Sequence, residues 1–195
     1  MARIDPLPRA ELGEHEARLA LVEEAMGFVP NSMLTMARVP GLAEAFQDLA
    51  GAVLRNPLIP PDLSQMVALM VSSGAGCRYC QAHTGHSAER LGVDDAKLAA
   101  MWDFETSALF DDAERAALRL AFHAGQVPNA ATDEDFAEAK RHYTDDEVTA
   151  IVSVCALFGY LNRWNDTMAT ELEPDPISFA ERVLAEGGWE GTKHM

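Results

Sequence analysis

The sequence is poor in positive charge and in long apolar runs. Its 15 lysine and arginine residues face 31 aspartate and glutamate residues, which gives a formal net charge of −16, and no basic stripe interrupts this balance. Such a surface repels phosphate backbones and anionic lipids, so we expect neither nucleic acid nor a membrane surface as a partner. No apolar run approaches the roughly 20 residues that span a bilayer.

Cysteine is also scarce, and this excludes a secreted disulfide framework. The chain has 3 cysteines, which cannot all pair with one another, and only Cys77 and Cys80 are close in sequence. Acidic residues interrupt the first twenty or so positions, where a signal peptide would carry its apolar segment. We therefore expect a protein of the reducing cytoplasm.

Alternation of apolar and polar residues, the mark of a half-buried strand, is missing, and helical periodicity takes its place. Leu63, Met66, Val67 and Met70 follow the i, i+3, i+4, i+7 pattern, with Asp62 predicted as the cap of their helix. We predict an all-α fold. The expected helices span about 12–26, 42–55, 62–73, 77–91, 95–102, 111–124, 133–142, 144–164 and 177–186, with a short one between 30 and 38.

Two local signals mark the ends of these helices. Gly27 is expected to end the first helix, and the longest helix is expected to begin at a capping box of Thr144 and Glu147.

SQMVALMVS (64–72) and DDEVTAIVS (145–153) each have a polar start before an apolar run. This likeness suggests an internal pseudo-repeat, with chance similarity between amphipathic helices as the alternative.

The segment GAGCRYCQAHTGH (74–86) concentrates the chemically active residues. Cys77, Cys80, His83 and His86 are all zinc-type ligands, but they follow one another in steps of three. On one helix each step rises about 4.5 Å, so the outer two lie roughly 13 Å apart and one ion cannot gather all four. We therefore expect no metal site.

A redox pair uses the same spacing directly. A C-x-x-C pair that opens a helix holds both sulfurs within disulfide reach and near backbone N–H groups that favour the thiolate. We expect Gly74 and Gly76 to form the turn into the helix, and His83 to face Cys80 and exchange its proton. The alternative is a pair of ordinary buried thiols, which is how we interpret Cys155.

Three stretches in order resemble one known family. They are GFVPNSMLTMARVPGLAEAF (27–46), LSQMVALMVSSGAGCRYCQAHTGHSAERLG (63–92) and VTAIVSVCALFGYLNRWNDTMATELEP (148–174). Together they resemble the peroxidase-related branch of the alkylhydroperoxidase AhpD-like, carboxymuconolactone decarboxylase superfamily. The resemblance covers about residues 26–174. It implies a single AhpD-like helical domain over 1–195, with helical extensions at both ends.

The resemblance also implies roles for particular residues. Cys80 would attack a hydroperoxide and Cys77 would resolve the product as a redox-active Cys77–Cys80 disulfide, with no other cofactor. The family's relay glutamate falls on Gln65, and an amide cannot relay a proton. Its relay histidine falls on Thr84, so we expect His83 to stand in and the activity to be weak or specialised.

The expected function is therefore that of a thiol-dependent alkyl hydroperoxide reductase. By the same resemblance its electrons come from a dithiol protein, lipoylated or thioredoxin-like, and it forms a homo-oligomer (dimer, trimer or hexamer). Thr84, His86, Asn162 and Trp164 are the candidates for lining the pocket. The alternatives are a non-redox enzyme such as a lactone decarboxylase, and a non-catalytic, redox-sensing oligomer.

Overall fold

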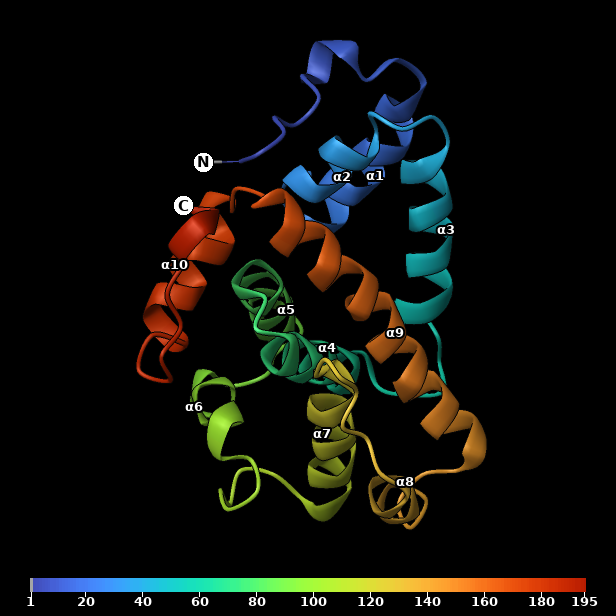
Figure 1. The fold of residues 1–195 in the computed structure, drawn as a ribbon, viewed down its shortest axis with the longest axis vertical. Coiled ribbons are helices and arrows are strands. Elements are labelled where there is room, and N and C mark those ends of the chain that lie inside the picture. The colour runs from blue at the N-terminus through green and yellow to red at the C-terminus, as the bar shows by residue number, and fades with distance from the viewer. Residues whose placement is uncertain (1) are drawn as a thin grey trace.

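Helices form the whole of the regular structure. The computed structural model describes residues 2–195, apart from the side chains of residues 14 and 25, and this part of the chain contains no strand, which confirms the all-α prediction (Figure 1). The α-helices are α1 (Glu16–Met26), α2 (Asn31–Met36), α3 (Leu42–Leu54), α4 (Pro61–Ala75), α5 (Arg78–Arg90), α6 (Asp95–Ala99), α7 (Asp112–Gly125), α8 (Asp133–Ala139), α9 (Asp145–Met168) and α10 (Pro174–Val183). Short 3-10 helices are η1 (Arg9–Glu11), η2 (Gly13–His15), η3 (Ala100–Asp103) and η4 (Thr192–His194).

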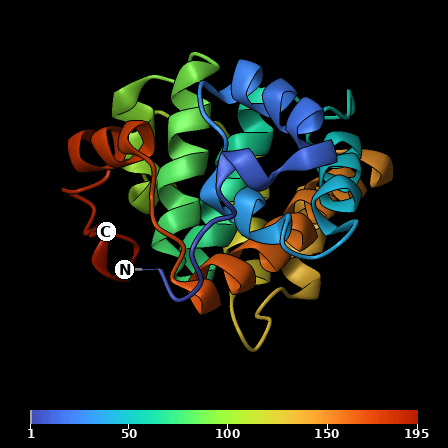
Figure 2. The same ribbon diagram turned by 90° about the horizontal axis from the view of Figure 1, so that it is seen from above.

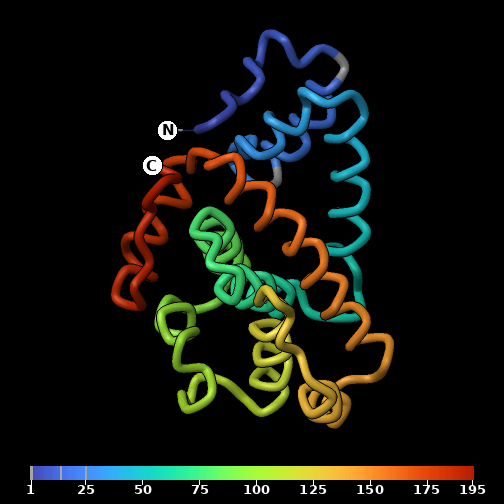
Figure 3. The backbone as a smooth tube through the Cα atoms, viewed as in Figure 1, coloured from blue at the N-terminus to red at the C-terminus, as the bar shows by residue number. Residues whose placement is uncertain are grey.

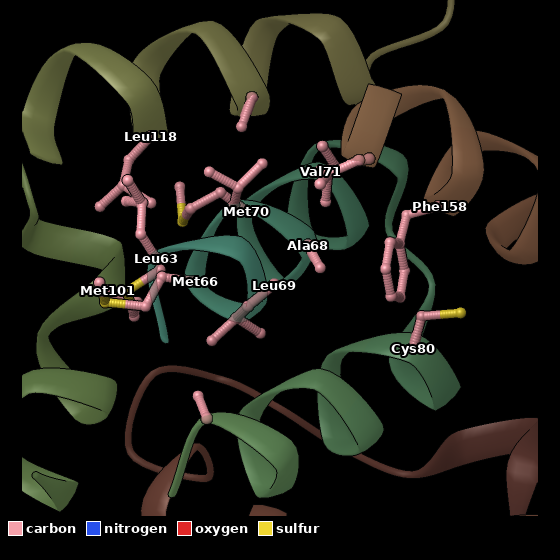
Figure 4. Packing of buried hydrophobic residues seen from close by; sticks show 14 of the residues in the cluster. Leu63, Met66, Ala68, Leu69, Met70, Val71, Cys80, Met101, Leu118 and Phe158 are labelled. Carbon is pink, nitrogen blue, oxygen red and sulfur yellow. The ribbon is translucent and has the colours of Figure 1, made fainter. Parts of the chain in front are cut away.

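Helix α4 lies at the centre, with α5, α7 and α9 packed around it (Figure 1). Its apolar residues are therefore buried on nearly every side, and Val67, Leu69 and Met70 lose almost all contact with solvent. Figure 4 shows Met70 on the side that faces Leu118 of α7 and Val71 on the side of Phe158 of α9. Burial of a Val, Leu or Met side chain contributes about 1.5–3 kcal/mol, so this packing holds α4 in place. Because α5 follows α4 after a short turn, the position of α4 also sets where α5 begins.

Two glycines allow α4 and α7 to cross closely. A Cβ atom on Gly74 would overlap the backbone carbonyl of Phe122, and one on Gly125 would overlap that of Val71. Gly74 therefore lies inside α4, and the prediction that it forms the turn before Cys77 is wrong. The turn is made by Gly76 alone, whose φ of +73° is the left-handed conformation that suits glycine.

A second layer covers the outer side of α9. Helices α1, α2 and α3 enclose a smaller core, and both ends of the chain lie near the last turn of α9 (Figures 2 and 3). The buried members of this core are Leu12, Leu19, Met33, Met36, Ala37 and Ala43. The backbone N–H of Arg3 donates to the Met168 carbonyl, which ties the N-terminal segment to the end of α9.

The helix ends follow local signals in most places. Gly27 ends α1 in a left-handed conformation, and the Thr144/Glu147 capping box opens α9, as predicted. Asp62 is not a cap: α4 begins one residue earlier at Pro61, because proline suits the first helical position and Asp62 falls in the first turn. Likewise α10 begins at Pro174 instead of 177, and the helix expected over 95–102 divides into α6 and η3.

The two segments of the suggested repeat lie in the middle of α4 (64–72) and at the start of α9 (145–153), and these two helices pack against each other. None of the helices among residues 2–195 combines the length and the apolar character needed to cross a membrane.

Candidate active site at the cysteine motif

The two motif cysteines lie where α4 turns into α5. Cys77 is the N-cap residue of α5, with an extended backbone, and Cys80 lies in the first turn of the helix. Both are reduced, and their exposed fractions are 0% and 2%. The thiols are neighbours, because the Cys77 side chain contributes to the raised pKa of Cys80. The helix therefore begins at the pair, as the spacing predicted.

Cys80 is placed against α9. Its side chain lies beside Phe158, and its sulfur points away from the leucines and methionines of α4 (Figure 4). Asn165 of α9 donates from Nδ2 to the Cys80 sulfur at 3.5 Å. Burial raises the pKa of the Cys80 thiol well above its usual value, the hydrogen bond with Cys77 raises it further, and the Asn165 amide lowers it. At neutral pH Cys80 is therefore a thiol with one donor already aimed at its sulfur.

Cys77 faces the last turn of α9 and the C-terminal segment. The Cys77 sulfur, a carboxylate oxygen of Asp166 and a ring nitrogen of His194 all lie within 4.8 Å of one another. His194 is held in place through Nδ1, which lies 2.8 Å from the Thr170 carbonyl. The Trp189 indole N–H donates to the Arg78 carbonyl at 3.0 Å. The C-terminal segment thus covers the start of α5.

His83 is bound to a buried carboxylate. Its Nε2 lies 2.6 Å from Oε2 of Glu173, and the other oxygen of Glu173 accepts from the Tyr79 hydroxyl at 3.0 Å and from the Asn31 backbone N–H. Burial opposes ionisation of Glu173, but the charge on His83 and these hydrogen bonds outweigh it, so the pKa of Glu173 lies below its usual value. The Tyr79 ring stacks on His83 with centroids 4.3 Å apart, which fixes the imidazole one turn after Cys80.

Three other residues singled out in the sequence either lie apart from the two thiols or have a side chain that is already bound to another group. Gln65 is half-buried on α4, and its side chain makes no hydrogen bond within the described part of the chain. Thr84 donates its hydroxyl to the Cys80 carbonyl at 2.7 Å, as a helix-bound threonine does. His86 stacks on Phe28 and lines a hollow of about 250 Å³ that the cysteines do not reach.

The two candidates on α9 differ from each other. Trp164 donates its indole N–H to the Thr35 hydroxyl at 3.2 Å, so it packs against α2. Asn162 is 4% exposed, and among the described residues neither its amide nitrogen nor its amide oxygen has a partner. The oxygen of Asn165, one turn later, has none either. Buried amides without partners mark a place where a ligand can bind.

Sequence reasoning missed three residues that the fold brings to the motif. Glu173 is 90 residues from its partner His83. Asp166 in the last turn of α9 and His194 in η4 are also distant from Cys77 along the chain. Glu173 carried one local signal, since an acidic residue before Pro174 is typical of a helix start, and this explains its position without any role in the site. His194 carried none.

Comparison with known proteins agrees with the resemblance found in the sequence. The sequence model of the carboxymuconolactone decarboxylase family matches residues 40–123. The uncharacterized protein YnjA of Escherichia coli (strain K12) is 30% identical over 115 residues, which are 58% of this chain and 62% of YnjA. That match therefore spans less than two thirds of its relative.

Solved structures match over nearly the whole chain. The debrominase Bmp8 in its apo form is 36% identical, with a TM-score of 0.86 over 92% of this chain and 97% of its own. A cysteine-to-alanine variant of Bmp8 in complex with 2,3,4-tribromopyrrole is 35% identical, with a TM-score of 0.87 over 92% of this chain and 96% of its own. An uncharacterized peroxidase-related protein with an AhpD core from Ralstonia eutropha JMP134 is 23% identical, with a TM-score of 0.78 over 91% of this chain and 95% of its own. At that identity the match shows a similar fold and no more. The chain thus carries the sequence pattern of the carboxymuconolactone decarboxylase family over residues 40–123, within an all-α fold similar to that of Bmp8 and of the AhpD-core protein.

Proposed function

We propose that this chain is a thiol-dependent reductase in which the Cys77/Cys80 pair gives two electrons to a small substrate and closes to a disulfide. The observation that carries the proposal is the pair itself. Two reduced, neighbouring thiols lie at a helix start, with the Asn165 amide donating to the sulfur of Cys80. A donor aimed at sulfur favours the thiolate, which is the reactive form.

The first substrate class is an alkyl hydroperoxide. The Cys80 thiolate attacks the outer peroxide oxygen, the O–O bond breaks, and the alcohol leaves after taking up a proton. The Cys77 thiolate then attacks the sulfenic sulfur of Cys80, and water leaves as the disulfide forms. A lipoylated or thioredoxin-like dithiol protein restores the pair. In sum, one hydroperoxide and two thiols give an alcohol, water and one disulfide.

His83 and Glu173 support this assignment of roles. The imidazole lies one turn after Cys80 and is held by a buried carboxylate, which suits its charged form to give a proton to the leaving alcohol. Gln65 and Thr84, at the family's relay positions, offer an amide and a hydroxyl already engaged with the backbone. A missing relay base is worth about 10²–10⁴ in rate, so we expect peroxide turnover to be slow.

The second substrate class is a halogenated aromatic ring, favoured by one observation. Two structures of the debrominase Bmp8 are 35% and 36% identical to this chain over 92% of its length, against 23% for the peroxidase-related protein. The net reaction uses the same two electrons: the aromatic bromide and two thiols give the debrominated ring, bromide, a proton and one disulfide. The unpartnered amide of Asn162 would then donate to, or accept from, the ring substituents of the substrate.

One experiment tests both classes. Reduced protein is mixed with an alkyl hydroperoxide or with a bromopyrrole, and product and Cys77–Cys80 disulfide are followed by mass spectrometry. We expect Cys80→Ser to abolish turnover, whereas Cys155→Ser, which removes a buried thiol of α9 with no role here, retains it. If Cys80→Ser turns over both substrates as fast as the wild type, the proposal is wrong, and lactone turnover without either motif cysteine would favour a decarboxylase.

We also propose a homo-oligomer. The outer faces of α3 and α9 expose Leu49, Val152 and Tyr160, which would be covered in an assembly. Sedimentation velocity at micromolar concentration checks this, and a monomer there would contradict it.

A further inference from the structure

Three electron-pair donors from distant parts of the chain converge at the C-terminal side of the motif. They are the Cys77 sulfur at the start of α5, a carboxylate oxygen of Asp166 in the last turn of α9, and a ring nitrogen of His194 in η4. All three lie within 4.8 Å of one another, and Oδ1 of Asp166 is 3.8 Å from Nε2 of His194. This set differs from the four in-line residues of the motif, which one ion cannot gather.

The hydrogen bonding of His194 decides which way its lone pair points. A carbonyl oxygen only accepts, so the 2.8 Å contact with Thr170 places the ring hydrogen on Nδ1. In the neutral ring Nε2 then carries the lone pair. This atom has no hydrogen-bond partner among the described residues, although the side chain is fully buried. A buried acceptor beside a carboxylate and a sulfur is unfavourable unless a proton or a metal cation is shared among them.

Lys193 supplies a positive charge to the Asp166 carboxylate alone. Its ammonium group lies 2.7 Å from Oδ1 of Asp166, and both side chains are about half exposed. It therefore balances the carboxylate from the solvent side. The buried Nε2 of His194 receives no donor from Lys193.

We propose that Cys77, Asp166 and His194 form a binding site for a thiophilic divalent cation, with Zn²⁺ as the type. Tetrahedral zinc with bonds of about 2.0–2.3 Å separates its ligand atoms by roughly 3.3–3.8 Å, and the measured Asp166–His194 separation falls in that range. Mixed sulfur, nitrogen and oxygen ligands suit zinc, and a bond from the other histidine nitrogen to a backbone carbonyl is the usual support of a metal-bound imidazole. A fourth position stays open for water.

Metal binding has a direct consequence for the cysteine pair. The Cys77 thiol loses its proton as the sulfur–zinc bond forms, and that proton goes to solvent. A sulfur bound to zinc cannot also close the disulfide with Cys80. The bound cation and the Cys77–Cys80 disulfide therefore exclude each other, whichever substrate the pair reduces.

The test uses metal uptake and no turnover, so its outcome is separate from that of the proposed function. Reduced, chelator-treated protein is titrated with Co²⁺, whose thiolate complex has a charge-transfer band, and then with Zn²⁺ against a chromophoric chelator. We expect one equivalent to bind, Cys77→Ser to lose the band, and His194→Ala or Asp166→Asn to weaken binding by about 10- to 100-fold. Cys80→Ser and the matched surface control His142→Ala should both retain the charge-transfer band and the wild-type affinity.

Two results would overturn the site. Equal affinity of wild type and His194→Ala would mean that His194 is not a ligand. A band that depends on Cys80 in place of Cys77 would mean that the ion binds away from Cys77, Asp166 and His194. A second measurement covers a variant that folds poorly: Zn²⁺ should protect Cys77 of the wild type from alkylation while Cys155 is unaffected. No protection would count against the site as well.

Discussion

Ionisation of Cys80 is the residue-scale property on which thiol chemistry at this site depends. Burial raises its pKa, so the thiolate fraction at pH 7 is below that of a free cysteine, whose pKa is about 8.5. We expect alkylation of Cys80 to be slow at pH 7 and to rise steadily above pH 9 or so. Site-resolved mass spectrometry after timed alkylation measures this. A half-maximal rate below pH 7 would contradict the burial argument.

The amide of Asn165 is expected to work against that burial. Replacing it with leucine removes the donor to the Cys80 sulfur, so the pKa should rise further and alkylation at pH 8 should slow by about tenfold, since one hydrogen bond to a charged group is worth about 1.5 kcal/mol. Asn162→Leu is the matched control, because the Asn162 amide makes no hydrogen bond. Equal slowing in both variants would show a packing effect instead.

Glu173 contributes to stability through its ionised form. Its pKa is lower in the folded protein than in the unfolded chain, so this contribution is complete above the unfolded value of about 4.3 and is lost as the pH falls through the folded value. We expect Glu173→Gln to lower the free energy of unfolding by about 3 kcal/mol at pH 7 and by less at an acidic pH below the folded pKa, where the wild type also loses the charge. Urea unfolding at both pH values, with exposed Glu134→Gln as control, tests this. An equal loss at both would point to packing alone.

At the scale of elements, the crossing of α4 and α7 fixes where α5 begins. Gly74→Ala or Gly125→Ala would force a methyl group into a backbone carbonyl of the facing helix, so we expect each to destabilise the fold by about 1–3 kcal/mol. Gly159→Ala is the matched control: its Cβ meets nothing within 4 Å, and alanine should stabilise α9 by up to about 1 kcal/mol. Chemical denaturation of the three variants measures the difference. A neutral Gly74→Ala would mean that the helices separate easily.

The same crossing shows what the sequence can and cannot predict about the elements. A capping box and a left-handed glycine act within a few residues, so Thr144, Glu147 and Gly27 were identified correctly. Gly74 was misinterpreted because its constraint comes from Phe122, a residue of another helix. The site follows the same division. The C-x-x-C pair is local and was found, whereas Glu173, Asp166 and His194 reach it only through the packing of α9 and the C-terminal segment.

For the molecule as a whole, the last residues of the chain control access to the motif. The backbone of His194 accepts from Leu172 N–H at 2.8 Å, and Trp189 is bound to the start of α5, so the segment 189–194 is anchored at both ends. Cys77 has no exposed surface beneath it. Under the proposed function, a reductant would reach Cys77 only after this segment moves.

Removing residues 192–195 should open that access without unfolding the rest. We expect alkylation of Cys77 to accelerate by about tenfold or more, because loss of η4 takes away His194, which buries the sulfur, at the cost of few contacts with the α4 core. Cys155 is the internal control: burial in α9 raises its pKa to about 12, so it reacts only if the whole fold opens. Faster modification of Cys77 with Cys155 unchanged would identify the C-terminal segment as the cover of the site, whereas parallel acceleration of both would mean that the deletion destabilises the fold as a whole.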